Sequence, residues 1–305
     1  MRSSSLFALA GTLAAAAAQN MSLCDKYTTA LLKDNNATNQ YTLLTLLVNT
    51  VVIGNYTQPN KNRVPGILAP GEYMGEQVNL LPYFNGELKS SNRGGSSGVS
   101  INFLDDGGAA PLMMNMPANS TDSNQYFLLT HLYQFFGKLL DCSGYSTMNF
   151  PKYSGVDMAS AHAFMALSPS EFGYFVTQVG LAATSFGVSS SDVSAVADVL
   201  NTLFGYRCSP KTTVIPEMGE TLNSICQNEK CPLDPNATCD AYPNKGIVME
   251  PELAMANATN GTGPSSTGMV PSGITTGESE FSGAATVERA AVGVVVGLLA
   301  FAVTF

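Results

Sequence analysis

The sequence contains no tryptophan, only two histidines and few charged residues. Lys, Arg, Asp and Glu make up 12% of its 305 residues, whereas a soluble domain usually has about 25%. Acidic residues outnumber basic ones, 23 to 14, which gives a formal net charge of −9, and no long run of Lys and Arg occurs. Because nucleic acids and anionic membrane surfaces attract basic patches, we expect no nucleic-acid partner.

The sequence signatures of several enzyme classes are also missing. There is no G-x-S-x-G motif of serine hydrolases and no G-x-x-x-x-G-K-S/T phosphate loop. The adjacent carboxylates Asp105 and Asp106 lie in a Gly-rich stretch, where we expect them to face water rather than act as a catalytic pair. Any site that needs imidazole has only His131 and His162 available.

Both ends of the chain look like processing signals. Residues 1–18 have a charged start, an apolar stretch and small residues before Gln19, as in a secretory signal peptide. Residues 283–305 follow the small residue Ser282 and end in sixteen uncharged residues. This order is typical of a GPI-attachment signal with Ser282 as the attachment residue. A transmembrane anchor is the alternative, although a spanning helix needs about twenty residues. We therefore expect an extracellular protein, anchored by lipid to the plasma membrane or cell wall.

Cysteines and glycosylation sequons agree with passage through the secretory pathway. An even number of cysteines in an oxidising compartment predicts three disulfides, with the pairing left open. The six cysteines are Cys24, Cys142, Cys208, Cys226, Cys231 and Cys239. A zinc site in the last three is a weaker alternative, because no His lies nearby. Seven sequons predict N-glycans at Asn20, Asn36, Asn55, Asn119, Asn236, Asn257 and Asn260.

Composition divides the chain into segments. Residues 254–282 are mostly Asn, Gly, Thr, Ser and Pro, so they cannot bury enough apolar surface to fold and are expected to form a glycosylated stalk. We expect a helical domain at 24–204, with surface insertions at 54–81 and 85–124. A Cys-rich extension at 205–249 separates that domain from the stalk.

Hydrophobic periodicity and capping sequences predict the helices. Residues 41–53 are apolar enough for either a buried helix or a strand, and 125–140 have the spacing of an amphipathic helix. The capping box that starts at Ser168 predicts a helix as far as Phe186, which Gly187 ends. A second N-terminal signal, from Ser189 to Asp192, predicts a helix to about Phe204 with Val193, Val196, Val199, Leu200 and Leu203 on one side. A short strand is expected around 99–103.

The stretch from Tyr126 to Phe204 resembles truncated haemoglobins. The spacing Y-x-G-x-x-M-x-x-x-H occurs as Tyr153, Gly155, Met158 and His162, with Phe172 ten residues after the histidine and Gly187-Val188 fifteen residues beyond. Residues 81–86 are similar to the short C–D segment of that family, and 41–53 would correspond to its helix B. The resemblance implies a mostly α, globin-like fold with two loop insertions and a disulfide-rich extension that the family lacks.

The resemblance also implies a haem b site with His162 as the proximal iron ligand. The residues implied to surround the haem are Phe84, Leu128, Leu132, Phe135, Met158 and Phe172. His131 has three alternatives: a surface residue, a distal hydrogen-bond donor or a sixth iron ligand. The chain departs from the family in two places. The part of the helix-B stretch that aligns with the distal position, LLVNTVVIG at 46–54, has no Tyr, and Leu132 occupies the usual polar distal position.

These patterns lead to competing functional hypotheses. The first is an extracellular, GPI-anchored protein that binds haem and through it O2 or NO. The second is a structural or adhesive cell-wall glycoprotein that keeps the scaffold without cofactor and contacts cell-wall glycans. The third is a haem enzyme of the peroxidase or nitric-oxide dioxygenase type. Without the resemblance, a lone histidine on an apolar helix is usually just buried and hydrogen-bonded. The Met113-Met114-Asn115-Met116 cluster is read as packing in preference to copper binding.

Overall fold

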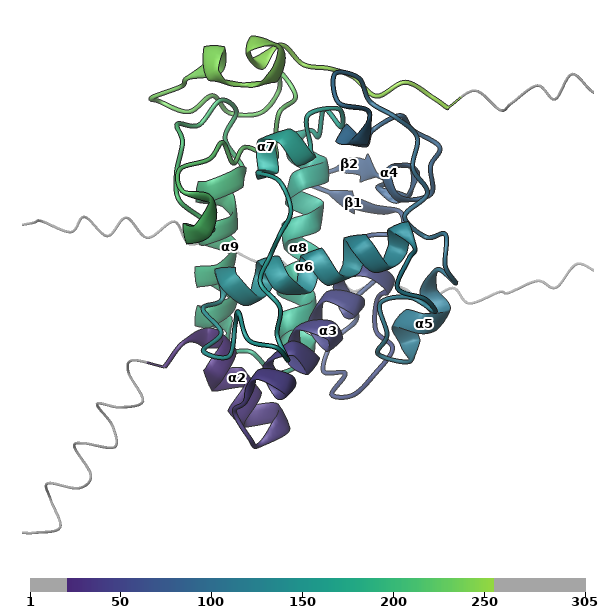
Figure 1. Ribbon diagram of the computed structural model, residues 1–305, viewed down its shortest axis with the longest axis vertical. Helices are drawn as coiled ribbons and strands as arrows, with labels where there is room; N and C mark the ends of the chain where they lie inside the picture. Colours follow the sequence, from purple (N-terminus) through teal and green to yellow (C-terminus); the bar gives the residue numbers. More distant parts are fainter. Residues whose placement is uncertain (1–20, 255–305) are drawn as a thin grey trace, which may run out of the picture. The chain divides into compact units, whose positions relative to one another are not determined.

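The computed structural model describes residues 21–254 (Figure 1). Several predicted features lie outside the described residues: the signal peptide, nearly all of the stalk, the anchor signal with Ser282, and the sequons Asn20, Asn257 and Asn260. Among the described residues, no helix combines the length and the apolar composition that crossing a bilayer requires.

The described part of the chain is mostly helical, as the sequence predicts. Its α-helices are α2 (Leu23–Leu32), α3 (Ala37–Ile53), α4 (Leu81–Phe84), α5 (Ala109–Met113), α6 (Asn124–Leu139), α7 (Met158–Ala161), α8 (Pro169–Ser185) and α9 (Ser190–Phe204). A two-stranded antiparallel hairpin is formed by β1 (Gly71–Tyr73) and β2 (Glu76–Val78). Short 3-10 helices occur at Asn92–Gly94, Pro216–Met218, Cys239–Ala241 and Pro243–Gly246.

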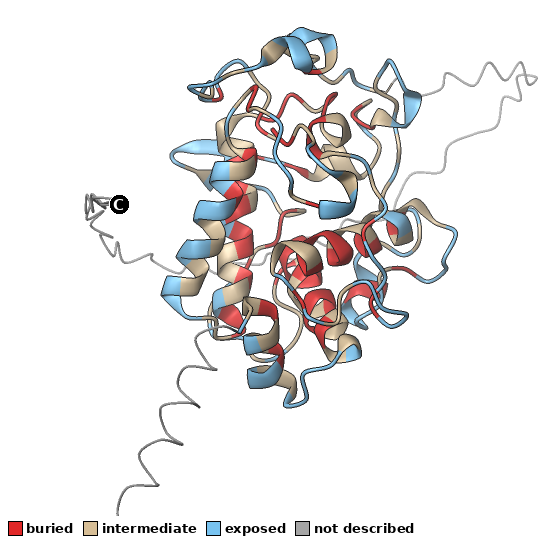
Figure 2. Cartoon of the chain, turned by 60° about the vertical axis from the view of Figure 1, so that its left-hand side comes forward, coloured by how far each residue is buried: buried red, intermediate tan, exposed pale blue. Residues whose placement is uncertain are grey.

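Helix α3 lies at the centre of the core and packs against α2, α6 and α8, while α8 also packs against α9. The ambiguous segment 41–53 is therefore a helix. Its N-cap is Asn36, whose side-chain oxygen accepts a hydrogen bond from the Asn39 amide at 3.0 Å. Buried residues line the facing sides of these helices (Figure 2), as expected for helices that share one hydrophobic core.

The predicted capping sequences are confirmed. At the start of α8, Ser168 Oγ accepts from the Glu171 amide and Glu171 Oε2 accepts from the Ser168 amide, at 3.2 and 2.8 Å. Gly187, with φ +87°, follows the end of the helix. In α9, the prediction that Val199 faces the core is wrong, because its side chain is 43% exposed. Val199 directly precedes the buried Leu200, and successive side chains of an α-helix are about 100° apart around its axis. When Leu200 faces the core, Val199 therefore faces away from it.

The two long stretches are not surface insertions throughout. Val64, Ile67, Val78 and Leu80 of the first stretch, and Leu112 of the second, are buried in the main core. Both strands of the hairpin contact α8. Short apolar pairs between Gly and Pro residues carry no periodic signal, which is why sequence patterns missed this contribution to the core.

Within the second stretch, the expected strand at 99–103 does not form. Only isolated bridges occur there, Ser91 with Val99 and Asn85 with Asn102. Asp105 is exposed as expected, but its carboxylate also accepts hydrogen bonds from the backbone amides of Asn124 and Gln125 at 3.2 and 3.0 Å. A carboxylate at the first amides of a helix stabilises the helix start, so Asp105 fixes this loop to α6.

All six cysteines form disulfides, which confirms three bonds and leaves none of these thiols for zinc. The pairs are Cys24–Cys142, Cys208–Cys239 and Cys226–Cys231. Several disulfides in one domain are typical of secreted proteins. The extension therefore closes on itself, while Cys24–Cys142 joins α2 to the residues after α6.

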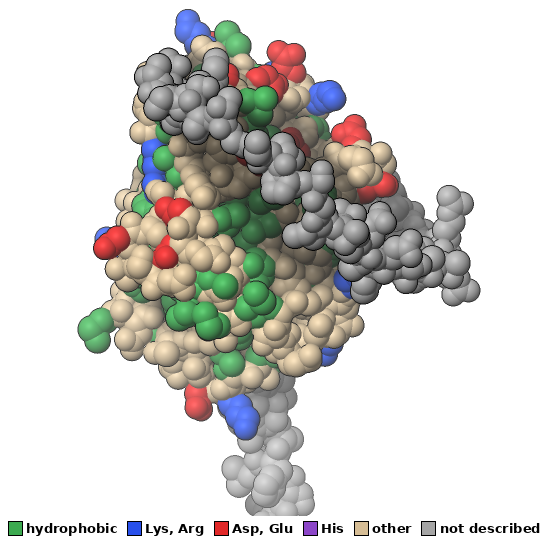
Figure 3. Space-filling model, turned by 90° about the vertical axis from the view of Figure 1, so that its right-hand side faces the viewer, with side chains coloured by type: hydrophobic (Ala, Val, Ile, Leu, Met, Phe, Trp, Pro, Cys, Tyr) green, Lys and Arg blue, Asp and Glu red, His purple; other side chains and the backbone are tan. Residues whose placement is uncertain are grey.

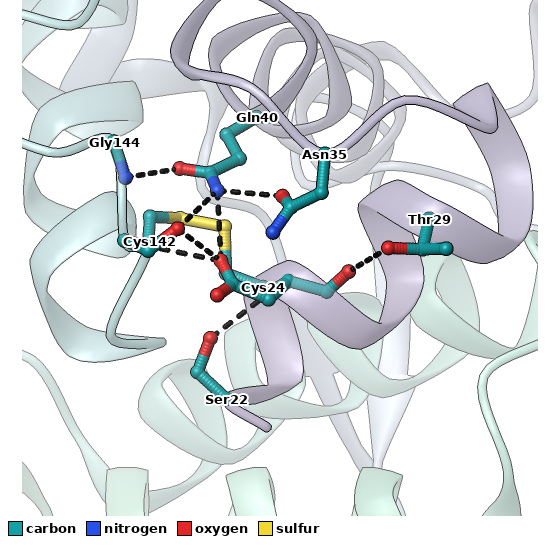
Figure 4. The surroundings of a disulfide bond; sticks show 9 residues. Ser22, Cys24, Thr29, Asn35, Gln40, Cys142 and Gly144 are labelled. Atoms are coloured by element: carbon teal, nitrogen blue, oxygen red, sulfur yellow. Dashed lines mark hydrogen bonds between the residues drawn. A yellow bond between two sulfur atoms is a disulfide. The ribbon is translucent and has the colours of Figure 1, made fainter. Parts of the chain in front are cut away.

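A buried polar network surrounds the Cys24–Cys142 disulfide (Figure 4). The Gln40 amide is fully buried and donates to Asp25 Oδ1 and to Asn35 Oδ1, both at 2.7 Å. Its carbonyl oxygen accepts from the Gly144 amide at 2.7 Å. Satisfying a buried amide in this way avoids a desolvation cost of about 1–3 kcal/mol. The network and the disulfide therefore both fix α2 to the residues that follow α6.

The predicted glycosylation sites that the structure describes differ in accessibility. Asn36, Asn119 and Asn236 are exposed. In Asn55, the side-chain oxygen accepts a hydrogen bond from the Val64 amide at 2.5 Å, and Nδ2, the atom that would carry the glycan, is buried. The folded chain therefore encloses the attachment atom of Asn55.

Candidate functional site

The candidate site is built on Tyr153, which joins the loop before α7 to helix α6. The Tyr153 ring is buried and packs edge-to-face against Phe135 and His131 of α6, with centroids 5.4 and 5.7 Å apart. Its hydroxyl donates to the Val156 carbonyl at 2.8 Å, and burial raises its pKa to about 12. The first residue of the Y-x-G-x-x-M-x-x-x-H spacing therefore positions the histidine segment against α6.

Gly155 has a steric reason to be glycine. A Cβ at this position would lie 2.2 Å from the Tyr153 hydroxyl oxygen and 2.4 Å from the adjoining ring carbon. Because Phe135 and His131 already hold the ring, it has little room to shift.

We expect Gly155→Ala to destabilise the fold by about 1–3 kcal/mol, the usual cost of overpacking. The free energy of urea unfolding measures this. Gly180→Ala is the matched control: this glycine lies inside α8, and its added Cβ would meet only a Val193 methyl at 3.3 Å. Since Ala favours helix over Gly, the control should be neutral or stabilising. Equal losses in both variants would contradict the steric argument.

His162 is held by its own short helix. Asp157 caps α7 by accepting from the Ser160 amide at 2.9 Å. The buried Met158 places its carbonyl oxygen 2.8 Å from His162 Nδ1. If Nδ1 carries the ring proton, it donates to this oxygen and leaves Nε2 with its lone pair free. Within residues 21–254, Nε2 of His162 makes no hydrogen bond, and the residue as a whole is half-buried.

The electrostatic surroundings keep His162 neutral. The residue is half-buried. Desolvation by the surrounding protein is the largest influence on the imidazole, and it lowers the pKa below its usual 6.5. The hydrogen bond to Met158 and the charge of Asp157 oppose this shift only in part. The imidazole is therefore uncharged at neutral pH.

The Cys-rich extension supports α7, which sequence reasoning missed. The Ala159 amide donates to the Leu222 carbonyl at 3.1 Å, and Gln227 Nε2 donates to the Ala159 carbonyl at 2.9 Å. Ala159 also belongs to a small buried cluster with Cys208 and Tyr242. A helix of four residues is not stable alone, so these long-range contacts keep His162 in place.

Helix α6 has two apolar faces. Leu129, Tyr133 and Phe136 are buried in the main core. The second face carries Phe135, which belongs to the same core, and Leu128 and Leu132, which pack against that core and remain partly exposed. The predicted distal residues therefore share a face that protein atoms cover only incompletely.

The other residues predicted to contact haem differ in how far they are buried. Phe172 and Met158 are buried in the core. Phe84, at the end of α4, is partly exposed, and its carbonyl accepts from the Phe103 amide at 2.7 Å. Its neighbour Tyr83 donates to Glu171 Oε1 at 2.8 Å, which ties α4 to the start of α8. The structure places Phe135 near the histidine segment through Tyr153, whereas within residues 21–254 no hydrogen bond or ring stacking joins Phe84 to His162.

His131 is a partly buried residue at the edge of the second face of α6. Its Nδ1 lies 2.6 Å from the Phe127 carbonyl, and its ring stacks on Phe127 at 3.9 Å between centroids. Nε2 faces the Ser154 hydroxyl at 3.4 Å. Burial lowers the pKa of His131, and the Arg93 charge lowers it further. Both ring nitrogens thus have protein neighbours, in contrast to His162.

A loop of the 85–124 stretch lies beside this region, which sequence patterns did not predict. The Arg93 guanidinium stacks 4.4 Å from the Phe127 ring centre. Gly98 lies against Phe164, since a Cβ there would be 3.0 Å from the Phe164 Cβ. The loop therefore touches both the start of α6 and the segment after His162.

The stretch 46–54, in which the sequence shows no distal Tyr, contains Asn49. This residue forms a buried polar pair with Tyr133. Asn49 of α3 is buried, accepts from the Tyr133 hydroxyl at 2.6 Å and donates to the Leu112 carbonyl at 3.1 Å. These bonds satisfy both groups internally, so the pair stabilises the α3–α6 contact.

The two hollows that the structure describes lie away from His162. One is an apolar cavity of about 50 Å³ among α2, α3, α6, α8 and α9, and the other is an open hollow of about 620 Å³ lined by 36–39 and 147–149. Ligand pockets usually have roughly 300–1,000 Å³. Within 21–254, no group of three His, Cys, Asp or Glu residues forms a metal site.

Comparison with known proteins identifies no relative of this chain. The chain matches no protein-family model, no curated protein and no solved structure. The resemblance to truncated haemoglobins therefore depends on the residue spacing alone.

Proposed function

We propose that the protein is an extracellular, GPI-anchored, globin-like protein that binds haem b through His162. The observation that carries the proposal is the His162 ring itself. It is neutral and half-buried, its Nδ1 is fixed to the Met158 carbonyl, and its Nε2 has no hydrogen-bond partner within residues 21–254. A neutral imidazole oriented by a backbone carbonyl is a good iron ligand.

The residues present fit a porphyrin in their chemistry. Besides the histidine, the incompletely covered face of α6 offers Leu128 and Leu132, and α4 offers the partly exposed Phe84. These side chains would exclude water from one side of an apolar ring, with about 25 cal/mol for each Å² that they bury. When bound, haem supplies an iron centre with affinity for O2 or NO.

Each neighbour of His162 has a positioning task in this proposal. Tyr153 holds the segment against α6, and the Met158 carbonyl holds the imidazole at Nδ1, which leaves Nε2 free to bind iron. Gln227 and Leu222 of the extension keep α7 from fraying. The buried Asn49–Tyr133 pair leaves the second face of α6 without a strong hydrogen-bond donor, so a bound gas would meet mainly apolar side chains there.

A haemin titration of the purified protein tests the proposal. We expect a Soret band that saturates at about one haem per chain, as one histidine ligand implies. Nonspecific adsorption of haemin to apolar surface would instead continue without saturation. A folded protein that takes up no haem would refute the proposal.

The pH dependence follows from the lowered pKa of His162. Protons and iron compete for Nε2, so lower pH must weaken haem binding. Because the pKa in the folded chain is below 6.5, affinity should stay constant from about pH 8 to 6.5 and fall only below that. The titration is best done in His131→Ala, where only His162 can contribute. A steep fall already above pH 6.5 would contradict the assignment.

One observation favours the second candidate, a structural or adhesive glycoprotein. Neither described hollow is lined by His162, and the enclosed one, about 50 Å³, is far smaller than a porphyrin. On this alternative the open hollow at 36–39 and 147–149, which the Asn36 sequon lines, is the feature that would matter. The haemin titration separates the two, since the alternative predicts no uptake by folded protein.

A further inference from the structure

Three methionines at the end of α5 are exposed, which overturns the expectation that they pack in the core. Met113, Met114 and Met116 are 56, 59 and 38% exposed. Large apolar side chains grouped on a surface usually mark an interaction site. Helix α5 lies at the right-hand edge of Figure 1, far from α7, so this group is separate from His162.

The backbone that carries these methionines has one fixed shape. The Met116 amide donates to the Pro111 carbonyl at 3.0 Å and the Asn115 amide donates to the Leu112 carbonyl at 3.1 Å. Asn115 has φ +60°. These two bonds with a left-handed residue between them form a Schellman helix end.

Contacts on both sides hold this turn in place. The Tyr56 hydroxyl donates to Asn115 Oδ1 at 2.8 Å, and the buried Asn49 donates to the Leu112 carbonyl at 3.1 Å. The three methionine Cα atoms are thus presented within a single turn that does not need to form on binding. Each thioether ends a side chain with three rotatable bonds, so the position of each sulfur can adjust to a bound ion.

We propose that Met113, Met114 and Met116 form a binding site for a soft monovalent cation, copper(I) or its analogue silver(I). Thioether sulfur is a soft, uncharged ligand that selects copper(I) over harder cations. All six cysteines are in disulfides, so no cysteine thiolate competes for the ion. Figure 3 turns this side of the molecule to the viewer and shows hydrophobic side chains gathered in the middle, with charged ones mostly toward the rim.

Silver(I) is the probe for the test, because it has no redox chemistry under these conditions and needs no reductant. The purified chain, with its methionine methyl groups labelled with ¹³C, is titrated with silver nitrate in chloride-free buffer. We expect the methyl signals of Met113, Met114 and Met116 to shift together and to saturate at about one equivalent, as a three-sulfur site requires.

A pair of matched variants makes the test specific. Replacing Met113, Met114 and Met116 together by Leu keeps apolar volume but removes the sulfurs, and should abolish the saturable binding. The control replaces Met74 and Met148, which are 87 and 93% exposed but isolated in the sequence, and should bind silver as the wild type does.

Two results would overturn the proposal. One is that the signals of Met74 and Met148 shift as strongly as those of the cluster, which would mean nonspecific binding to exposed thioethers. The other is that the Leu triple variant keeps the same silver affinity. Neither result depends on haem.

Discussion

His162→Ala is expected to reduce haem affinity roughly a hundredfold or more, about 3 kcal/mol at 1.4 kcal/mol for each factor of ten. The variant removes Nε2 and with it the coordinate bond, while the apolar contacts of Leu128, Leu132 and Phe84 remain. Haemin titration followed at the Soret band measures the change. Because the ring bonds only to Met158 and is partly accessible, the fold should survive the substitution.

His131→Ala is the matched control, since it removes the other histidine of the chain. His131 stacks on Phe127 and Tyr153, so the variant should lose some packing and change the spectrum at most, without loss of haem uptake. If His131→Ala abolished uptake and His162→Ala did not, the assignment of the iron ligand would be wrong.

Removal of the Cys24–Cys142 disulfide is expected to cost about 4–5 kcal/mol of the free energy of unfolding. This bond closes a loop with a sequence separation of 118, so its loss gives the unfolded chain much more freedom. Replacing both cysteines by Ala and measuring urea unfolding tests the expectation. Because small domains have only about 5–15 kcal/mol in total, this change alone brings the protein close to unfolding.

The Cys226–Cys231 disulfide is a matched control. All four of these cysteines are buried, so the two double variants lose similar packing, but the second bond closes a loop with a separation of only 5. Its removal should cost about 2 kcal/mol on the same entropic account. Equal losses in the two variants would show that local packing, rather than loop closure, dominates.

The long helices were predictable because their signals are local. Capping residues such as Ser168 and Ser189 lie next to the turns that they cap, and α6 has a periodic apolar pattern. The short stretches of the core were not predictable, since Val64 and Val78 become buried only through contacts with α8 and its neighbours. Exposure of the methionines at 113–116 follows from a helix end whose partners, Tyr56 and Asn49, are distant in the sequence.

The sequence singled out His162 as the centre of the candidate site but did not indicate the residues that support it. The spacing from Tyr153 to His162 singled out the histidine, and the structure gives this spacing local reasons in ring packing, a glycine contact and a helix cap. The role of Gln227 depends on a contact across 68 residues. No pattern in a single sequence indicates such a pairing.

The central claim is that His162 Nε2 binds the haem iron, and rescue of His162→Gly by free imidazole tests it most directly. The variant leaves a gap the size of the ring beside Met158. We predict that the folded variant shows little Soret absorbance with haemin alone and regains it when imidazole is added, because the free ligand replaces the lost side chain. A variant that binds haem equally with and without imidazole, or a folded one that imidazole does not rescue, would contradict the claim.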